Sequence, residues 1–154
     1  MWQVIIRVPL RLTGGGPGLF KIAADGTKVF ARSGVLNGST RFVNSFNSIT
    51  VAGANVYVTG SVDGDWSFEG SSITQSGLRD AVLISYGTDG TLNWLKTLGG
   101  PGEDYANEVV VDNAGNVFWA ADFDGISTTV DGTTLNNFGA GLDAVLLKIQ
   151  GTDG

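Results

Sequence analysis

The sequence predicts an all-β protein built from repeated four-stranded units. The stretch Asp-Ala-Val-Leu-Ile-Ser-Tyr-Gly-Thr-Asp-Gly at 80–90 is written again, with small changes, at 143–154. The two copies begin 63 positions apart, and a degraded third copy lies one period upstream at 18–26. No apolar run follows the i, i+3, i+4 spacing of a helix, and Val, Ile, Thr and aromatic residues dominate between glycines. A repeat of this length is typical of propellers, solenoids and arrays.

One hairpin of each unit is predicted around an Asp-Gly pair. The segments 27–32 and 91–96 follow such pairs and alternate apolar with polar residues, which is the period of a half-buried strand. Their alignment places Phe30 and Trp94 at the same position. Asp and Gly tolerate the positive φ that the centre of a tight hairpin turn requires. The Asp-Gly pairs therefore join the last two strands of a unit.

The other hairpin of each unit comes from two further pairs of aligned segments. Residues 47–51 match 107–111, and residues 55–60 match 116–121. In each unit the two segments are joined by a short turn that contains Gly, which is typical of a β-hairpin. One period is thus four strands, A to D in chain order.

Each unit also carries a polar excursion between strands B and C. The excursions, 62–73 and 123–135, share an ending of an acidic residue, Gly, two Ser or Thr residues and an apolar residue. This ending predicts a small extra hairpin. The chain then divides, within a single repeat domain, into an N-terminal strand and linker (1–17), a first repeat (18–79), a second repeat (80–142) and the start of a third (143–154).

Four-stranded antiparallel units that repeat around an axis make a β-propeller. The second unit carries the fullest set of motif residues: Asp80-Ala-Val-Leu83, Asp89-Gly90, Trp94, Gly99-Gly-Pro-Gly-Glu-Asp-Tyr-Ala-Asn107, Val109-Val-Val-Asp112 and Gly115-Asn-Val-Phe118. Together they resemble the bacterial β-propeller repeat family called SBBP, over most of residues 18–154. The resemblance implies propeller blades in a bacterial surface or secreted protein, without a chemistry that members share.

The strand count leaves the predicted ring incomplete. From Gly18 the order is C-D, A-B-C-D and A-B-C. Four apolar residues of the N-terminus fall on one face of a further predicted strand: Trp2, Val4, Ile6 and Val8. Pro9 cannot donate to a ladder and favours an edge position. We expect this assembly strand to pair as a D strand beside 143–149, in its own or a neighbouring chain, or to act as a B strand that leads into Gly18.

About two and a half blades do not close a ring, since propellers use about four to eight. Two explanations follow from this count. The chain is a piece of a longer protein, or several copies share strands across open blade edges and form a ring or a filament. Unless the chain is a fragment, a homo-oligomer is therefore expected.

Composition excludes several functional classes. Fifteen acidic against nine basic side chains give a net charge of −6, and the basic ones are scattered, so nucleic acid is not an expected partner. No run approaches the about 20 apolar residues of a membrane helix, so membrane insertion is not expected. The chain has no His and no Cys, which excludes disulfides, Ser-His-Asp and Cys-His catalysis and the usual zinc sites. We therefore expect no enzyme activity.

Two aromatic side chains stand outside the strand patterns. Trp66 lies in the first excursion, and Tyr105 follows the Gly-Gly-Pro-Gly segment. Propeller lectins hold sugars with aromatic rings beside Asp or Asn side chains. Trp66, Tyr105 and Asp104 are therefore the candidate ligand-binding residues.

One excursion also offers a candidate calcium site. Asp63, Asp65 and Glu69 place alternate carboxylates on a single loop, and calcium takes several oxygen ligands. The alternative is that the Asp-Gly pair simply forms a turn and that the acids are solvated surface. Apart from calcium, no cofactor is expected.

These features predict a non-catalytic module that acts as a protein-binding or assembly scaffold. The family resemblance implies an extracellular or cell-surface location in a bacterium. A carbohydrate-binding propeller lectin assembled from several chains is the first alternative, and a structural fibre or virion subunit is the second. The expected partner is a protein or a glycan.

Overall fold

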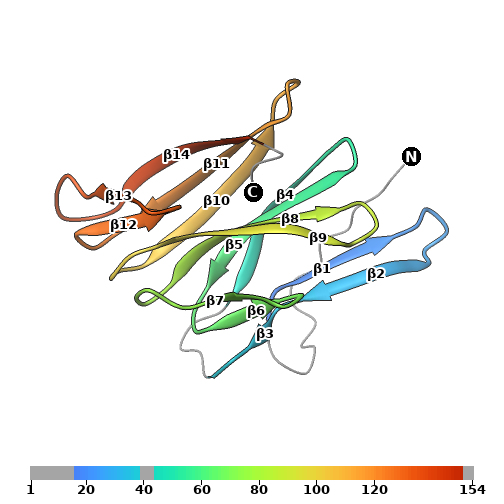
Figure 1. The fold of residues 1–154 in the computed structure, drawn as a ribbon, viewed down its shortest axis with the longest axis horizontal. Coiled ribbons are helices and arrows are strands. Elements are labelled where there is room, and N and C mark those ends of the chain that lie inside the picture. The colour runs from blue at the N-terminus through green and yellow to red at the C-terminus, as the bar shows by residue number, and fades with distance from the viewer. Residues whose placement is uncertain (1–15, 39–43, 151–154) are drawn as a thin grey trace.

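The computed structural model describes residues 16–38 and 44–150 of the chain, and these form an all-β fold without a helix (Figure 1). The all-β prediction is confirmed. The predicted N-terminal strand, with Trp2, Val4, Ile6 and Val8, lies outside the described residues. Within the described ranges there is no helix long and apolar enough to cross a membrane.

The described residues form four sheets. Their orders are β1-β2, β3-β6-β7, β10-β11-β14 and β13-β12-β9-β8-β5-β4. The strands are β1 (Gly18–Ile22), β2 (Lys28–Ser33), β3 (Val35–Leu36), β4 (Ser45–Ala52), β5 (Asn55–Val62), β6 (Trp66–Phe68), β7 (Ser71–Ile73), β8 (Asp80–Gly87), β9 (Leu92–Gly99), β10 (Asp104–Val111), β11 (Asn116–Phe123), β12 (Ser127–Val130), β13 (Thr133–Asn136) and β14 (Asp143–Gln150).

The predicted hairpins are confirmed by the strand pairing. β4 pairs with β5, β8 with β9 and β10 with β11, all antiparallel. Within the six-stranded sheet, β4-β5-β8-β9 is a continuous four-stranded meander. The three-stranded sheet β10-β11-β14 repeats the first three positions of that meander. Both first strands carry a bulge at the same place in the repeat, after Phe46 in β4 and after Ala106 in β10.

The polar excursions form the two extra hairpins that their shared ending predicts. β6 pairs with β7, and β12 pairs with β13. The turn residues all have positive φ, at 48° for Glu69, 91° for Gly70, 48° for Asp131 and 75° for Gly132. Two consecutive residues with positive φ make the tight turn that matches strand twist. The acidic residue and Gly at each ending therefore specify the hairpin.

β8 is the central strand of the molecule and lies between two apolar cores. Its residues Val82 and Ile84 belong to one core, with Leu19, Phe30, Trp66 and Phe68. Its residues Ala81 and Leu83 belong to the other core, with Val109, Trp119 and Phe123. A strand that is covered on both faces is apolar at consecutive positions. This explains why Ala-Val-Leu-Ile in β8 does not alternate with polar residues.

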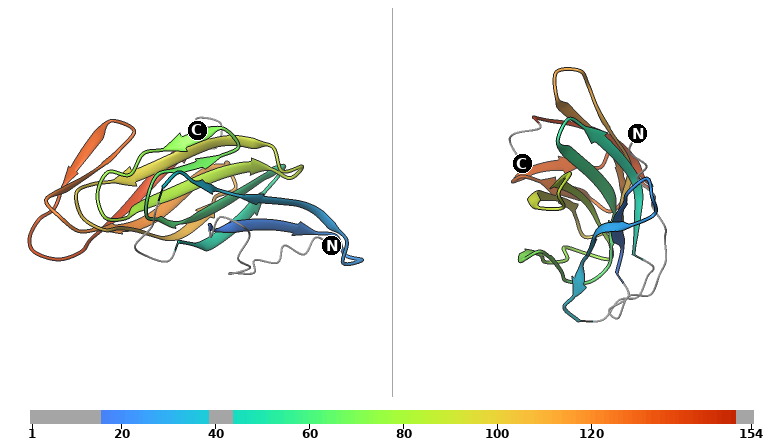
Figure 2. Two further views of the ribbon diagram at one scale, coloured as in Figure 1. Left: turned by 90° about the horizontal axis from the view of Figure 1, so that it is seen from below. Right: turned by 90° about the vertical axis from the view of Figure 1, so that its right-hand side faces the viewer.

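The hairpin β1-β2, the meander β4-β5-β8-β9 and the sheet β10-β11-β14 follow one another along the molecule in the order of the chain (Figure 1). β10 lies against β4, β5 and β8. The hairpin β1-β2 and the sheet that ends in β14 occupy opposite ends of the molecule (Figures 1 and 2).

Candidate functional site

The candidate site is the outer face of the sheet β10-β11-β14. Val110 pairs with Phe118, which pairs with Lys148, and Glu108 pairs with Ala120, which pairs with Leu146. Side chains of residues that pair across antiparallel strands point to the same face. We call this surface the end face and define its apolar part as Val110, Phe118, Ala120, Ala144 and Leu146.

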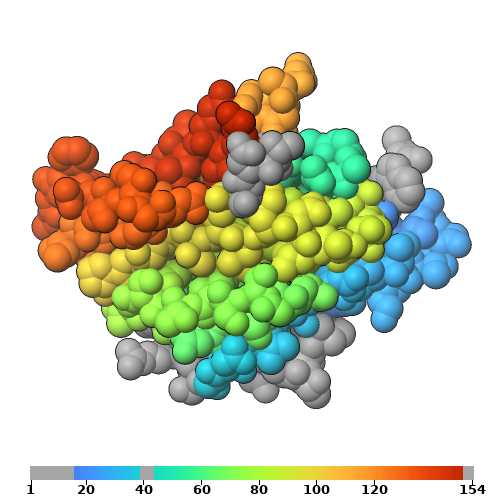
Figure 3. Space-filling view, viewed as in Figure 1, coloured from blue at the N-terminus to red at the C-terminus, as the bar shows by residue number. Residues whose placement is uncertain are grey.

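The end face is apolar and open to solvent. Leu146 is 69% exposed and Val110 is 48% exposed. Phe118 is half-buried, and the Lys148 ammonium lies 5.8 Å from the centre of its ring. Atoms of β14, drawn in red, reach the surface of the molecule (Figure 3). Exposed apolar residues that share one sheet face mark an interaction surface more strongly than isolated ones do.

The same face of the meander β4-β5-β8-β9 is covered over β5 and β8, whereas Trp94 and Lys96 of β9 are half-buried. Leu83 is the counterpart of Leu146 in the repeat, since Asp80 and Asp143 begin the same motif, and Leu83 is 0% exposed. The neighbouring face residues of β5, β8 and β9 are also buried: Tyr57, Thr59, Ser61, Ala81 and Leu98. The strand that covers them is β10, which contacts β4, β5 and β8. The meander β4-β5-β8-β9 thus has this face buried beneath the sheet that follows it in the chain, β10-β11-β14.

Polar groups of the covered face hold β10 at its bulge. Asn47 Nδ2 donates to the Ala106 carbonyl oxygen at 2.7 Å, and the Ala106 N–H donates to Ser61 Oγ at 3.0 Å. These bonds satisfy the backbone N–H and C=O of Ala106, which lies in β10 at the edge of its sheet and directly before the bulge. The counterparts on the end face are Asn107 and Asp122, which bond to each other at 2.8 Å. The end face therefore carries polar side chains at the same repeat positions at which Asn47 and Ser61 bind β10.

The outer edge of β14 differs from the corresponding edge of β8. β8 is paired on both sides, with β5 and β9. Among the described residues, β14 is paired only with β11. An unpaired strand edge presents backbone N–H and C=O groups to another strand. β14 therefore offers a partner both the apolar side chains of the end face and an unpaired backbone edge.

The prediction that Trp66 is available to a ligand is wrong. Trp66 is 0% exposed, and its Nε1–H donates to the Asp63 carbonyl oxygen at 2.9 Å. The indole stacks on Phe68 with ring centres 6.3 Å apart. The reason is that β6 and β7 fold back beside β3, so that the excursion carries its aromatic residues into the first core. Trp66 is a core residue.

Tyr105 and Asp104 are adjacent in β10, but their surroundings differ. Tyr105 is half-buried, its hydroxyl bonds to the Glu103 carboxylate, and the Arg79 guanidinium lies 5.2 Å from its ring centre. Asp104 is completely buried and accepts a hydrogen bond from the Gly100 N–H at 2.8 Å. Of the three candidate ligand-binding residues, only Tyr105 reaches the surface.

The three candidate calcium ligands do not form a site. Asp63 is buried and accepts from Gln75 Nε2 at 2.9 Å, whereas Asp65 accepts from the Gln75 N–H at 2.9 Å. Glu69 lies in the hairpin turn, 3.5 Å from Arg32 Nε. No group of three or more acidic side chains within the described ranges is arranged to hold a metal ion. Asp63 and Asp65 instead accept hydrogen bonds from Gln75, and because Asp63 is buried, these acids are not all solvated surface either.

Two carboxyl groups are buried at the starts of strands: Asp104, which the sequence suggested as a ligand-binding residue, and Asp80, which it did not single out for a site. Burial raises the pKa of Asp80 to about 7 and that of Asp104 to about 6. Each uses Oδ2 to accept one backbone N–H, from Ser76 and Gly100 respectively, and each has an Oδ1 without a hydrogen-bond partner. Asp80 is the first residue of β8 and Asp104 is the first residue of β10. Each side chain accepts an N–H of the preceding loop and so holds that loop against the sheet. They are closed off from solvent and offer no open catalytic position.

The chain was compared with known families and proteins. No family model matches it, and no curated protein matches it. The resemblance to the SBBP repeat therefore depends on the motif residues alone.

Proposed function

We propose that this chain is a non-catalytic β-propeller-type repeat module whose function is assembly, and that a second copy of the chain covers the end face. In this proposal β4-β5-β8-β9 is a complete blade, and β10-β11-β14 supplies three strands of the next blade within the described residues. The SBBP-type motif residues support a bacterial surface or secreted location.

The observation that carries the proposal is the contrast between Leu83 and Leu146. Identical residues at one repeat position are 0% exposed beneath β10 and 69% exposed in β14, which no described strand covers. Covering Leu146 as Leu83 is covered removes most of an apolar side chain from water, which stabilises the complex by about 1.5–3 kcal/mol for a leucine. Val110 and Phe118 add to the same surface.

A second copy has a complementary surface at its other end. In β1, Phe20 is half-buried, and in β2, Val29 is exposed. Phe20 pairs with Ala31, so by alternation it lies on the opposite face from Leu19 and Phe30, which pack into the first core; Val29 is left unpaired where the register shifts. The two surfaces differ and lie at opposite ends of the molecule (Figures 1 and 2). Such contacts are heterologous and generate a ring or an open filament.

The absence of His and Cys from the sequence and the closed surroundings of Asp80 and Asp104 support a non-catalytic role. The burial of Trp66 removes one of the two aromatic residues on which the lectin alternative depends. Assembly is therefore the function that the geometry supports best.

Sedimentation velocity over a range of protein concentrations tests the proposal. The wild type is expected to associate into multiples of the 16.0 kDa chain. Leu146→Asp is expected to weaken association at least about tenfold, because burying an unpaired carboxylate is costly. The control is Ile126→Asp, which adds the same charge at an exposed apolar residue of the loop before β12. A wild type that stays monomeric, or equal weakening by both variants, would contradict the proposal.

A further inference from the structure

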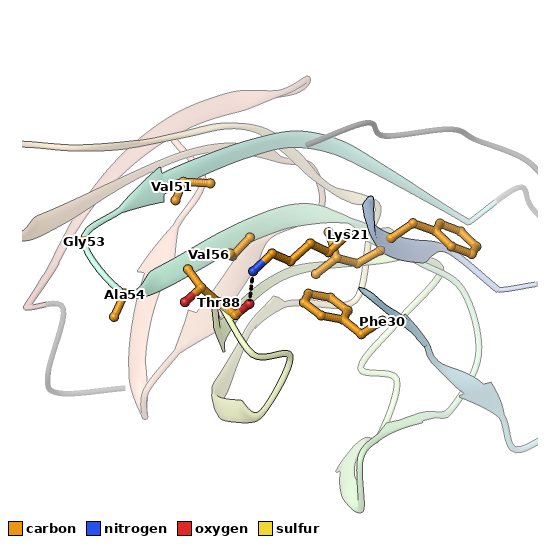
Figure 4. A pocket seen from close by; sticks show the side chains of 9 residues that line it. Lys21, Phe30, Val51, Gly53, Ala54, Val56 and Thr88 are labelled. Carbon is orange, nitrogen blue, oxygen red and sulfur yellow. Dashed lines mark hydrogen bonds between the residues drawn. The ribbon is translucent and has the colours of Figure 1, made fainter. Parts of the chain in front are cut away.

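An apolar pocket lies between the hairpin β1-β2 and the turns that connect β4 to β5 and β8 to β9 (Figure 4). Its volume is about 410 Å³. Its apolar walls come from Leu19, Phe20, Phe30, Val51 and Val56. Pockets for small molecules typically measure about 300–1,000 Å³ and have mostly apolar walls with a few polar groups.

The repeat explains why this space is open. Phe30 aligns with Trp94, whose larger indole packs on Tyr57 at 5.8 Å between ring centres. Trp94, Tyr57 and Val111 thereby contribute to the core between the meander β4-β5-β8-β9 and the sheet β10-β11-β14. At the corresponding place in the first unit the smaller ring of Phe30 leaves space against β4 and β5. The pocket is therefore a feature of the first unit rather than of the repeat.

The pocket has one charged wall. Lys21 extends along it, and its ammonium Nζ donates to the Thr88 carbonyl oxygen at 2.5 Å (Figure 4). Arg32 Nε donates to the Gly90 carbonyl oxygen at 2.7 Å in the same turn. These two contacts hold β1-β2 against the β8-β9 turn, so the pocket walls are fixed by hydrogen bonds. A lysine ammonium has three donors and attracts an anionic head group.

We propose that this pocket binds a small monocarboxylate with an apolar body of about ten carbons, such as a medium-chain fatty acid. The apolar body lies among Leu19, Phe30, Val51 and Val56, and the carboxylate lies beside the Lys21 ammonium. Protein cavities of about 150 Å³ already admit benzene, so a pocket of about 410 Å³ accommodates a longer body. The pocket lies away from the end face but shares Phe20 with the β1-β2 surface that a second copy is proposed to contact. The binding of the carboxylate does not itself require assembly.

Isothermal titration calorimetry with decanoate and 1-decanol tests the proposal on the full chain. Decanoate is expected to bind one site, and decanol is expected to bind about tenfold to hundredfold more weakly, because a neutral hydroxyl replaces the carboxylate that pairs with the ammonium charge. Lys21→Met is expected to remove this difference and to retain decanol binding. Equal affinities for the two probes in the wild type would overturn the assignment of the carboxylate to Lys21.

Phe30→Trp tests the location of the site. It introduces the residue that the repeat itself carries at this position and is expected to abolish decanoate binding by filling the pocket. Phe138→Trp, at an exposed loop residue, is the matched control and is expected to bind as the wild type does. If Phe30→Trp does not fold, Val51→Trp blocks the pocket from a half-exposed position instead. No binding by the wild type at millimolar decanoate, or undiminished binding by the folded blocking variant, would overturn the proposal.

Discussion

Asp80→Asn is expected to change how the stability of the protein depends on pH. Asp80 is almost completely buried at the start of β8, and burial raises its pKa from the ordinary 3.8 to about 7. The neighbouring charges of Asp104 and Asp65 raise it further, while the hydrogen bond from the Ser76 N–H lowers it. Between pH 3.8 and about pH 7, Asp80 therefore carries a proton in the folded protein but has lost it in the unfolded chain.

The sign of the effect follows from this proton. Because the folded state binds more protons between about pH 4 and 7, the free energy of unfolding falls as the pH rises through this window. A pKa raised from 3.8 to about 7 corresponds to at most about 4 kcal/mol. Asp104, whose pKa burial raises to about 6, acts in the same direction. Asp25, Asp89 and Asp112 have lowered pKa values, so their ionisation is complete by pH 5 in both states.

The measurement is urea unfolding followed by tryptophan fluorescence at pH 5, 6, 7 and 8. Asn cannot ionise, so the stability of Asp80→Asn relative to the wild type is expected to rise by up to about 2.7 kcal/mol between pH 5 and pH 7, where the pKa of Asp80 lies, and to level off by pH 8. Asp143→Asn is the matched control, since Asp143 begins the same motif in β14 and accepts the Phe138 N–H at 2.7 Å, but is only half-buried. A difference between Asp80→Asn and the wild type that does not change with pH would refute the burial argument.

Two further substitutions test the packing of the core and of the hairpin β4-β5. Trp66→Ala is expected to lower the free energy of unfolding by about 3–5 kcal/mol, the usual cost of removing a buried aromatic side chain; a loss below about 1 kcal/mol in chemical denaturation would contradict its position in the core. Gly60→Ala places a Cβ 2.0 Å from the Ser45 carbonyl oxygen, so its melting temperature is expected to fall. Gly139→Ala, with nothing within 4 Å of the added Cβ, is expected to melt as the wild type does.

The hairpins could be predicted because each depends on residues close together in the chain. Alternation along β10 and β11 indicates one buried face, and Glu69-Gly70 matches a turn in which both residues have positive φ. Each of these signals can be read from one short segment, without knowing what the segment packs against. The match between the copies at Asp80 and Asp143 then assigned the remaining strands to equivalent positions.

The surroundings of individual side chains could not be predicted in the same way. Trp66 is buried because the chain far upstream approaches it, and a Cβ at Gly34 would lie 2.8 Å from the indole. The burial of Asp80 likewise depends on Gly99, where an added Cβ would lie 2.9 Å from the carboxyl group. The sequence marks neither approach, because glycine at these positions resembles glycine in any loop. The sequence pattern does not predict the pocket beside Phe30, although one copy of the repeat has Phe30 where the other has the larger Trp94.

The accessibility of position 146 in solution tests the proposed assembly most directly. The chain has no Cys, so Leu146→Cys places a single thiol on the end face. Its rate of labelling with a maleimide is expected to fall severalfold as the protein concentration rises, while Ile126→Cys is labelled at a constant rate. A thiol at position 146 that reacts as fast as the one at position 126 at every concentration would show that the end face stays uncovered.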